Sequence, residues 1–247
     1  MTQGDGFAVR SLALTYRDGH LLAPHAHPWA QFVYALSGVM HVAADAQIWL
    51  TPPTRGVWIP AGAAHEIRVH GETSLRTLYL GPELAQRVAR RVESVVVVPL
   101  LRELILHIVA LEMLRTETPA HAHLIEVLMD LLAEAPGTDL SLPLPRDPRA
   151  LELAHRLRAA PDDKSSLDAC AAKTGASLRT LQRCFSEETG MTIESWRQKA
   201  RLVHGAALLV SGASVTGAAL GCGYDSPSAF SAAFRRQFGV TPGRFRR

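Results

Sequence analysis

The spacing of hydrophobic and polar positions changes once in the first half of the chain. Over residues 7–80, runs rich in Val, Ile, Leu, Tyr and Trp are separated by Gly, Pro and Asp. This pattern predicts short strands at 7–16, 30–38, 38–50, 56–60, 65–70 and 73–80. Regular short strands of this kind favour an all-β sandwich or barrel.

Residues 82–135 place apolar residues three and four positions apart, which is the period of an amphipathic helix. We expect helices at 82–95, 99–117 and 123–135. The middle helix carries one broad apolar surface, made of Leu101, Leu104, Ile105, Ile108, Val109 and Leu111. Such a surface can pack on the β-domain or form a homodimer interface, and the pattern leaves both open.

A repeat occupies the last third of the chain. Residues 176–193 and 225–242 align 49 positions apart, with identities at Ser177/Ser226, Phe185/Phe234, Gly190/Gly239 and Thr192/Thr241. Repetition of this kind indicates a duplicated structural unit.

Each copy has the pattern of a helix-turn-helix. In the first, we expect Ser165 to cap a helix, Gly175 to supply the turn and Ser177 to cap the second helix. In the second, the corresponding residues are Ser214 as the first cap, Gly221 and Gly223 at the turn, and Ser226 followed by Pro227.

Between the copies, residues 193–210 predict one continuous helix. Eighteen residues at about 1.5 Å each span roughly 27 Å. One turn of DNA is about 34 Å, so such a helix could hold two recognition helices in successive major grooves.

Charge divides the chain at the Pro-rich segment 136–148, which we interpret as a linker. Residues before 146 carry ten Arg, no Lys and fourteen acidic residues, a net charge of −4. The remainder carries sixteen Lys and Arg against nine acidic residues, a net charge of +7. A basic half predicts a polyanionic partner. The expected domains are 1–81 (effector sensing), 82–135 (helical dimerisation or relay) and 149–247 (DNA binding).

Composition narrows the class further. The chain is 47% hydrophobic, has no run of eighteen apolar residues, and begins without the basic-then-apolar order of a signal peptide. Its three cysteines show no C-x-x-C spacing. These features predict a cytoplasmic protein with no membrane segment, whose cysteines pack in the core.

Residues 150–247 resemble the DNA-binding domain of the AraC/XylS family of transcription regulators. The resemblance rests on LQRCFSEETGMTIESWRQKARL and on GYDSPSAFSAAFRRQFGVTPGRFR. It implies two helix-turn-helix subdomains joined by a long helix, binding to double-stranded DNA, and activation through contact with RNA polymerase; repression is equally open.

The first recognition helix should present Arg179, Thr180, Gln182 and Arg183, because Leu178, Leu181 and Phe185 occupy its apolar face. Arg pairs with guanine and Gln with adenine. The second helix offers Ser228 and Ser231, which hydrogen-bond weakly, and Arg235 and Arg236 as phosphate partners. We therefore expect the first helix to supply most base discrimination.

Most of the histidines lie in the front half. The stretch from Gly19 to Gly38 fits G-x5-H-x-H-x3-E-x6-G, with Gln31 in place of Glu, and Pro60–His65 fits P-x-G-x2-H. Residues 7–80 thereby resemble a cupin barrel, although Thr54 and Val69 depart from the second motif. In a strand His25 and His27 would face the same way, and Gln31 and His65 could complete the set.

Three interpretations of this set stay open. The first is a site for zinc, nickel, copper or iron, to which Gln31 would be a weaker ligand than Glu. The second is a metal-free pocket for an organic effector, lined by Trp29, Tyr34, Trp49 and Trp58. The third is an internally satisfied core. A second pair, His121 and His123, should be solvated, since residues two apart on a helix do not share a face.

The sequence thus predicts an α+β multidomain chain: a cupin-like β-barrel with flanking helices, followed by an all-α double helix-turn-helix domain. We expect a non-enzymatic, homodimeric DNA-binding regulator that senses a small molecule or metal. The alternative is a cupin-type metal-dependent dioxygenase or isomerase carrying a DNA-binding tail, against which the absence of a carboxylate at Gln31 argues.

Overall fold

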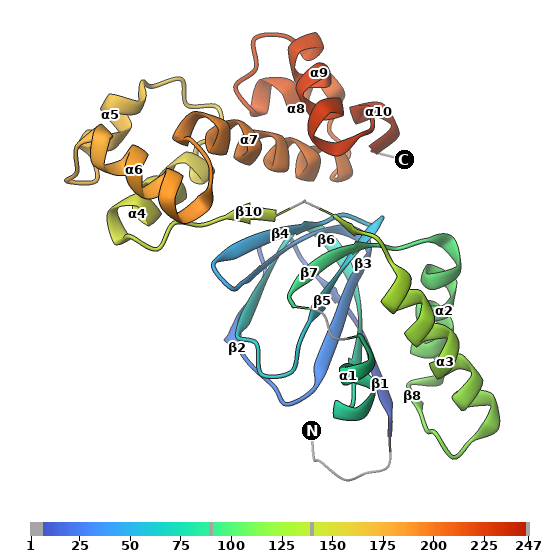
Figure 1. The fold of residues 1–247 in the computed structure, drawn as a ribbon. Helices are drawn as coiled ribbons and strands as arrows, with labels where there is room; N and C mark the ends of the chain where they lie inside the picture. Colours follow the sequence, from blue (N-terminus) through green and yellow to red (C-terminus); the bar gives the residue numbers. More distant parts are fainter. Residues whose placement is uncertain (1–6, 89–90, 139–140, 246–247) are drawn as a thin grey trace. The chain divides into compact units, whose positions relative to one another are not determined.

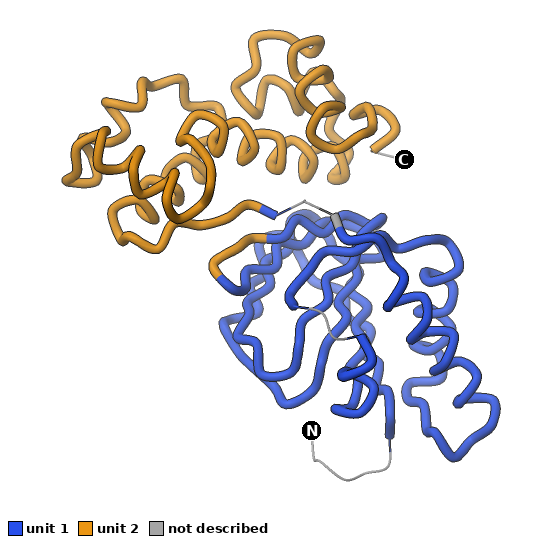
Figure 2. The backbone as a smooth tube through the Cα atoms, viewed as in Figure 1, with its two compact units in different colours: residues 1–45, 49–141 blue, residues 46–48, 142–247 orange. Residues whose placement is uncertain are grey.

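The computed structural model describes residues 7–88, 91–138 and 141–245. The first six residues, two residues of the expected helix 82–95, and residues 139–140 of the expected linker lie outside the described part. The chain divides at Ser141/Leu142 into two compact units, and the short stretch Ala46–Ile48 groups with the second (Figure 2). The first unit is β-rich and the second helical, which confirms the predicted fold class.

The first unit is built on an antiparallel sheet whose strand order is β8-β1-β6-β3-β5-β7-β9, with β2 beside β6 and β4 beside β3 (Figure 1). Among the described residues this order does not close into a ring. Its elements are β1 (Val9–Tyr16), β2 (Leu21–His25), β3 (Ala30–Ala44), β4 (Gln47–Thr51), β5 (Arg55–Ile59), β6 (His65–Leu80), α1 (Pro82–Val88), β7 (Glu93–Val96), α2 (Pro99–Leu111), β8 (Met113–Leu114), α3 (Pro119–Glu134) and β9 (Gly137–Thr138).

Two long strands replace four predicted short ones. β3 continues through Gly38, and β6 continues through Gly71, because the β3–β6 register shifts beside Gly38 and the chain bends there without ending. Gly38 has φ +79°, and a Cβ at this position would lie 2.3 Å from Thr73 Oγ1. Glycine therefore allows a bulge where the sequence pattern indicates a turn.

The sheet has two buried faces. One contains Phe32, Tyr34 and Leu78 and is covered by α1, α2 and α3; the other contains Val33, Ala35 and Ile67. The expected apolar surface of the middle helix mostly serves the first face, since Leu101, Leu104, Ile105 and Ile108 are all buried in it. Leu111 is 39% exposed.

Two of the three expected helices are shorter than predicted. The helix from Pro82 ends at Val88, and Glu93–Val96 is strand β7, paired with β5, because the β-branched run SVVVV suits a strand. The next helix ends at Leu111, since Glu112 has φ +65° and Met113–Leu114 pairs with β1. The third begins at Pro119, earlier than predicted.

The second unit contains β10 (Ser141–Pro143), in part, and seven helices among the described residues. These are α4 (Pro148–Ala159), α5 (Leu167–Ala172), α6 (Leu178–Thr189), α7 (Ile193–Val210), α8 (Val215–Gly221), α9 (Pro227–Phe238) and α10 (Pro242–Phe245). The predicted helix 193–210 is confirmed. The expected linker 136–148 thus holds two short strands and the first residue of α4.

The capping residues explain these helix starts. The hydroxyls of Ser177, Ser214 and Ser226 each accept a backbone N–H from the first turn, which confirms the predicted caps. Ser166, and not Ser165, caps α5; the Ser165 amide instead donates to Asp163 Oδ1. The predicted turn residue Gly175 has φ +72°, a conformation that favours glycine.

Candidate nucleic-acid interface and histidine cluster

Helix α6 presents the predicted polar face to solvent. Leu181 and Phe185 are buried, whereas Arg179, Gln182 and Arg183 are exposed. Thr180 is half-buried, and its Oγ1 lies 2.9 Å from the capping Ser177 Oγ. Its hydroxyl therefore belongs to the helix cap as well as to the predicted interface.

The guanidinium of Arg183 is loosely held. Its Nη1 lies 3.8 Å from Glu187 Oε2, one turn along α6, and both side chains are more than 60% exposed. An exposed pair of this kind contributes little free energy, so the guanidinium can leave it to contact a base edge.

Helix α9 is less polar. Phe230 and Phe234 are buried, Ser228 is exposed and Ser231 is half-buried. Arg235 and Arg236 are exposed in the last turn. The first half of α9 thus offers small side chains, and its charge lies at the far end.

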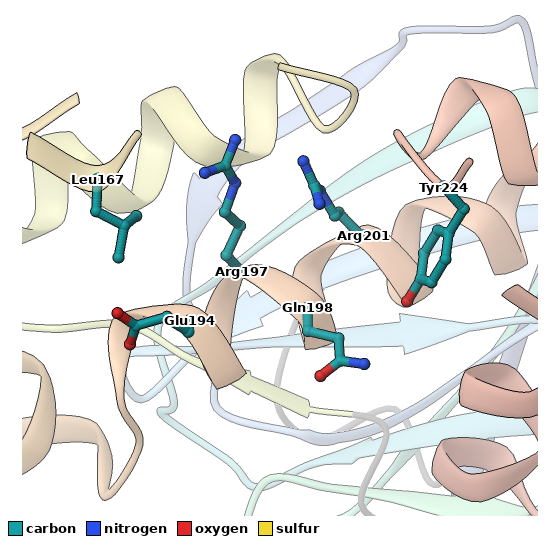
Figure 3. A pocket seen from close by; sticks show the side chains of 6 residues that line it. All are labelled: Leu167, Glu194, Arg197, Gln198, Arg201 and Tyr224. Carbon is teal, nitrogen blue, oxygen red and sulfur yellow. The ribbon is translucent and has the colours of Figure 1, made fainter. Parts of the chain in front are cut away.

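Helix α7 connects the two helix-turn-helices, and its packing on α9 depends on Gly205. A Cβ at Gly205 would lie 2.7 Å from the Phe230 ring and 3.0 Å from Cys222 Sγ. Along the same helix, Glu194, Arg197, Gln198 and Arg201 line a pocket of about 280 Å³ together with Leu167 and Tyr224 (Figure 3). The spacing of residues along the sequence does not indicate this pocket.

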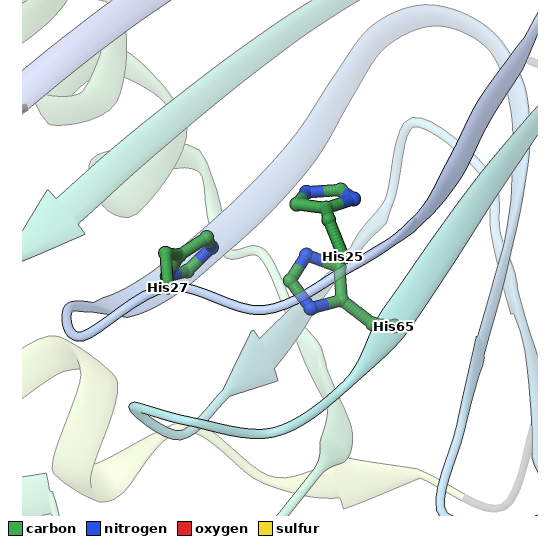
Figure 4. Close-up of side chains that lie close together, drawn as sticks. All are labelled: His25, His27 and His65. Carbon is green, nitrogen blue, oxygen red and sulfur yellow. The ribbon is translucent and has the colours of Figure 1, made fainter.

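In the first unit, His25, His27 and His65 come together (Figure 4). One ring nitrogen from each lies within 4.8 Å of the other two. His25 ends β2 and is exposed, while His27 lies beyond the strand, so the strand alternation used to align them does not apply. His25 and His65 converge because β2 pairs with β6 and places these two residues opposite each other, and His27 follows two residues beyond the end of β2.

Each ring is oriented by a nearby carbonyl. The Nδ1 atoms of His25, His27 and His65 lie 2.8, 2.7 and 2.9 Å from the carbonyl oxygens of Ala23, Trp29 and Ala63. A carbonyl oxygen only accepts, so these partners assign a proton to each Nδ1, and in the neutral form of each ring Nε2 carries the lone pair. This is the tautomer that can ligate a metal through Nε2.

His65 is 2% exposed, and its Nε2 is buried with no hydrogen-bond partner among the described residues. Burial lowers the pKa of His65, and the neighbouring His25 and His27 lower it further. The imidazole is therefore kept neutral, with an unsatisfied acceptor directed at the cluster.

Gln31 completes the cluster from β3. Its Oε1 lies 3.1 Å from His27 Nε2, while its Nε2 donates to Thr77 Oγ1 at 2.9 Å and to the Tyr79 hydroxyl at 3.4 Å. In this orientation of the amide, two acceptor atoms face each other, and a cation bound by both would remove the repulsion. The donor set therefore fits a transition metal.

Thr77 and Tyr79 were not identified from the sequence. They lie two apart on β6, and the strand register places Tyr79 opposite Gln31. The signal was the alternation of polar residues in TSLRTLYL, but the pairing of β6 with β3 is needed to interpret it.

The four aromatic residues expected to line an effector pocket do not share one face of the sheet. Tyr34 and Trp58 lie in the core beneath the helices, and Trp49 lies in the opposite core. Trp29 is buried with the Arg10 guanidinium 5.7 Å from its ring centroid. Of the second histidine pair, His123 is exposed and His121 accepts the Arg115 amide at 3.3 Å.

The β-rich unit is followed along the chain by two helix-turn-helices that share one connecting helix. This arrangement defines a DNA-binding regulator with a separate sensing unit. Comparison with known families agrees with this class. Residues 10–154 match the AraC-like ligand binding domain, and residues 170–247 match a helix-turn-helix domain. The chain belongs to the AraC family of transcriptional regulators. Among the described residues no helix is long and apolar enough to cross a membrane.

Individual relatives match all or part of the chain. The HTH-type transcriptional regulator NimR of Escherichia coli K12 is 32% identical over 221 residues, covering 90% of this chain and 81% of NimR. The HTH-type transcriptional regulator RipA of Corynebacterium glutamicum is 38% identical over 42% of this chain and 31% of RipA. The DNA-binding domain of AdpA, solved with a target DNA, is 34% identical, covers 40% of this chain and 90% of that chain, and has a TM-score of 0.37.

Proposed function

We propose that the chain is a sequence-specific regulator whose two helix-turn-helices bind successive major grooves of one duplex. The observation that carries this is the exposed Arg179, Gln182 and Arg183 face of α6 beside a buried apolar face. These side chains match the donors and acceptors of guanine and adenine edges. We call each helix-turn-helix a head: the first contains α6 and the second contains α9. The length of α7, roughly 27 Å, suits two heads that bind one side of the duplex.

The two heads contribute unequally. Ser228 and Ser231 offer weak and promiscuous hydrogen bonds, and Arg235 and Arg236 lie where phosphate contacts are expected. Base discrimination therefore resides mostly in α6, with Thr180 at its first turn, and α9 contributes mostly to affinity.

Selection of binding sites from a random duplex library tests this part. The selected duplex and a scrambled duplex of equal length are compared at one salt concentration, because phosphate contacts alone change strongly with salt. We expect tighter binding of the selected duplex by a factor of at least 10³. Equal binding of both would indicate an architectural protein without sequence preference.

We further propose that His25, His27, His65 and Gln31 bind one transition metal, such as zinc, nickel, copper or iron. The partnerless, buried Nε2 of His65 supports this, as does the approach of Gln31 Oε1 to His27 Nε2. A bound cation would cross-link the end of β2 to the start of β6 and to β3. The bound metal can regulate DNA binding only if it binds two conformations of the protein with different affinity.

Elemental analysis of the purified protein tests the metal. We expect a stoichiometric metal in the wild type and its loss in His25→Ala/His27→Ala. The control His121→Ala/His123→Ala removes two histidines outside the cluster and should keep the metal. A wild type without metal would favour an organic effector held by Gln31 together with Thr77 and Tyr79.

We propose a cytoplasmic homodimer that uses exposed residues of α2 and α3, such as Leu100 (60% exposed) and Val127 (42%), and that contacts RNA polymerase as an activator. We propose no catalytic role. A dioxygenase or isomerase would normally place a carboxylate at position 31, and Gln31 supplies none.

A further inference from the structure

The segment Pro161–Ser165, which joins α4 to α5, is held by two arginines of α7. Arg197 Nη1 donates to the Ser165 carbonyl at 2.9 Å, and Arg197 Nη2 donates to the Asp163 carbonyl. Arg201 Nε donates to the Pro161 carbonyl at 2.7 Å, and its Nη2 donates to the Asp163 carbonyl at 2.8 Å. We call this segment the brace. It enters the first helix-turn-helix directly, because Ser166 caps α5.

The brace also touches the second helix-turn-helix. Gly223, in the turn between α8 and α9, has φ +73°, and a Cβ there would lie 3.0 Å from Asp162 Cα and 3.2 Å from Arg201 Nη2. Lys164 Nζ lies 2.5 Å from Asp225 Oδ1, two residues before α9. This ion pair is exposed and adds little by itself. The close backbone approach at Gly223 is the more specific contact.

The hydrogen bonds that hold the brace depend on arginine side chains at positions 197 and 201. Each guanidinium directs two N–H groups at backbone carbonyls in a fixed planar fork, which an ammonium group cannot reproduce. Figure 3 shows both side chains rising from the same face of α7. Four hydrogen bonds therefore fix a connecting segment that would otherwise be a surface loop, and fix it where it meets both heads.

We propose that Arg197 and Arg201, by holding the brace against Gly223 and Asp225, fix the separation and angle of α6 and α9. They thereby determine which spacing between two DNA half-sites the protein accepts. This inference rests on the proposed binding of both heads to one duplex. One added base pair rotates the second half-site by roughly 35° and moves it by about 3.4 Å. Two heads held at a fixed separation and angle should lose affinity when the spacing changes by one base pair, whereas two heads that can move relative to each other should lose less.

The first experiment needs no DNA. Spin labels are attached to Ser186→Cys in α6 and Ala229→Cys in α9, both exposed positions, and the inter-label distance distribution is measured in the full chain. The native cysteines are buried, and burial raises the pKa of Cys184 and raises that of Cys222 to about 12, so they resist labelling. We expect a narrow distribution, and one at least twice as wide in Arg197→Lys/Arg201→Lys.

This variant keeps both charges and removes only the forked geometry. Arg244→Lys, at an exposed position of α10, is the matched control and should leave the distribution unchanged. If the double variant does not fold, Gly223→Ala serves instead, since both arginines are retained while the added methyl group presses on Asp162 of the brace and on the Arg201 guanidinium. An unchanged distribution in a folded variant overturns the proposal.

The second experiment measures affinity for the selected duplex with the half-site spacing changed by one base pair. We expect the wild type to lose at least tenfold and the double variant to lose threefold or less. Equal losses in both proteins overturn the proposal. If the wild type binds selected and scrambled duplexes alike, the proposed function fails, and the distance measurement still decides whether the arginines fix the two heads.

Discussion

Trp196 Nε1 donates to the carbonyl oxygen of Pro143 at 2.5 Å, across 53 residues of sequence. Trp196 is fully buried in α7, with its ring packed edge-to-face on Phe185. Nearby, the Glu188 carboxylate at the end of α6 accepts the amides of Arg146 and Asp147. The chain that precedes α4 is therefore fastened to α6, the second helix of the first helix-turn-helix, and to the connecting helix α7.

Replacing Trp196 with Phe should remove this hydrogen bond and keep most of the ring packing. We expect the free energy of unfolding to fall by about 1–2 kcal/mol, since the Pro143 carbonyl loses a buried donor. Trp49→Phe is the matched control, because Trp49 Nε1 has no hydrogen-bond partner among the described residues. Urea unfolding of both variants measures the difference, and equal losses would show that volume alone matters.

Arg183→Ala should weaken binding to the selected duplex by about 1–3 kcal/mol and relax the preference at one base pair. Binding to scrambled DNA should change little at the same salt concentration. Glu187→Ala, which removes only the loose ion-pair partner, serves as the control and should leave specificity intact. Titration against single-base variants of the site provides the measurement; a uniform loss across all sequences would assign Arg183 to phosphate contact.

Burial lowers the pKa of His204 in α7, as it does for His65 in the sheet. The unfolded chain then binds protons at a higher pH than the folded chain, so stability is full above about pH 6.5 and declines as pH falls through the lowered pKa. We expect the midpoint of urea unfolding to fall between pH 7.5 and pH 5.5. His204→Gln should reduce this fall, and an identical fall in the variant would contradict the assignment.

Gly205→Ala tests which of two opposing effects is larger. Alanine favours a helix over glycine by about 1 kcal/mol. At Gly205, however, the added methyl group would overlap the Phe230 ring, and overpacking costs about 1–3 kcal/mol. We expect net destabilisation in urea. Gly243→Ala, which has open space around the added Cβ, should be neutral or stabilising; stabilisation by Gly205→Ala as well would refute the close packing.

Local rules were sufficient to predict most of the second unit. Serine caps, a turn glycine and apolar spacing placed α6, α7 and α9 correctly, because a helix is determined by residues within four positions of one another. The error at Ser165 is of the same kind. Two adjacent serines can each cap, and the bond from the Ser165 amide to Asp163 decides between them.

The sheet was harder to predict, because its strands depend on distant partners. The pattern could not show that β3 and β6 pass through Gly38 and Gly71, or that the valines of β7 leave a helical period to pair with β5. The three histidines were found from a motif, but Thr77 and Tyr79 emerge only from strand register. The brace depends on hydrogen bonds between segments more than thirty residues apart, which no local spacing encodes.

The three rings of the histidine cluster are oriented independently of one another. Each imidazole is oriented by a hydrogen bond to a carbonyl two residues away in the chain. The orientation of each ring therefore depends on its own local backbone and not on the other two rings. Loss of one histidine leaves the other two pointing as before. If the cluster is the proposed metal site, single substitutions can therefore change its set of ligands one residue at a time while the sheet that carries it stays the same.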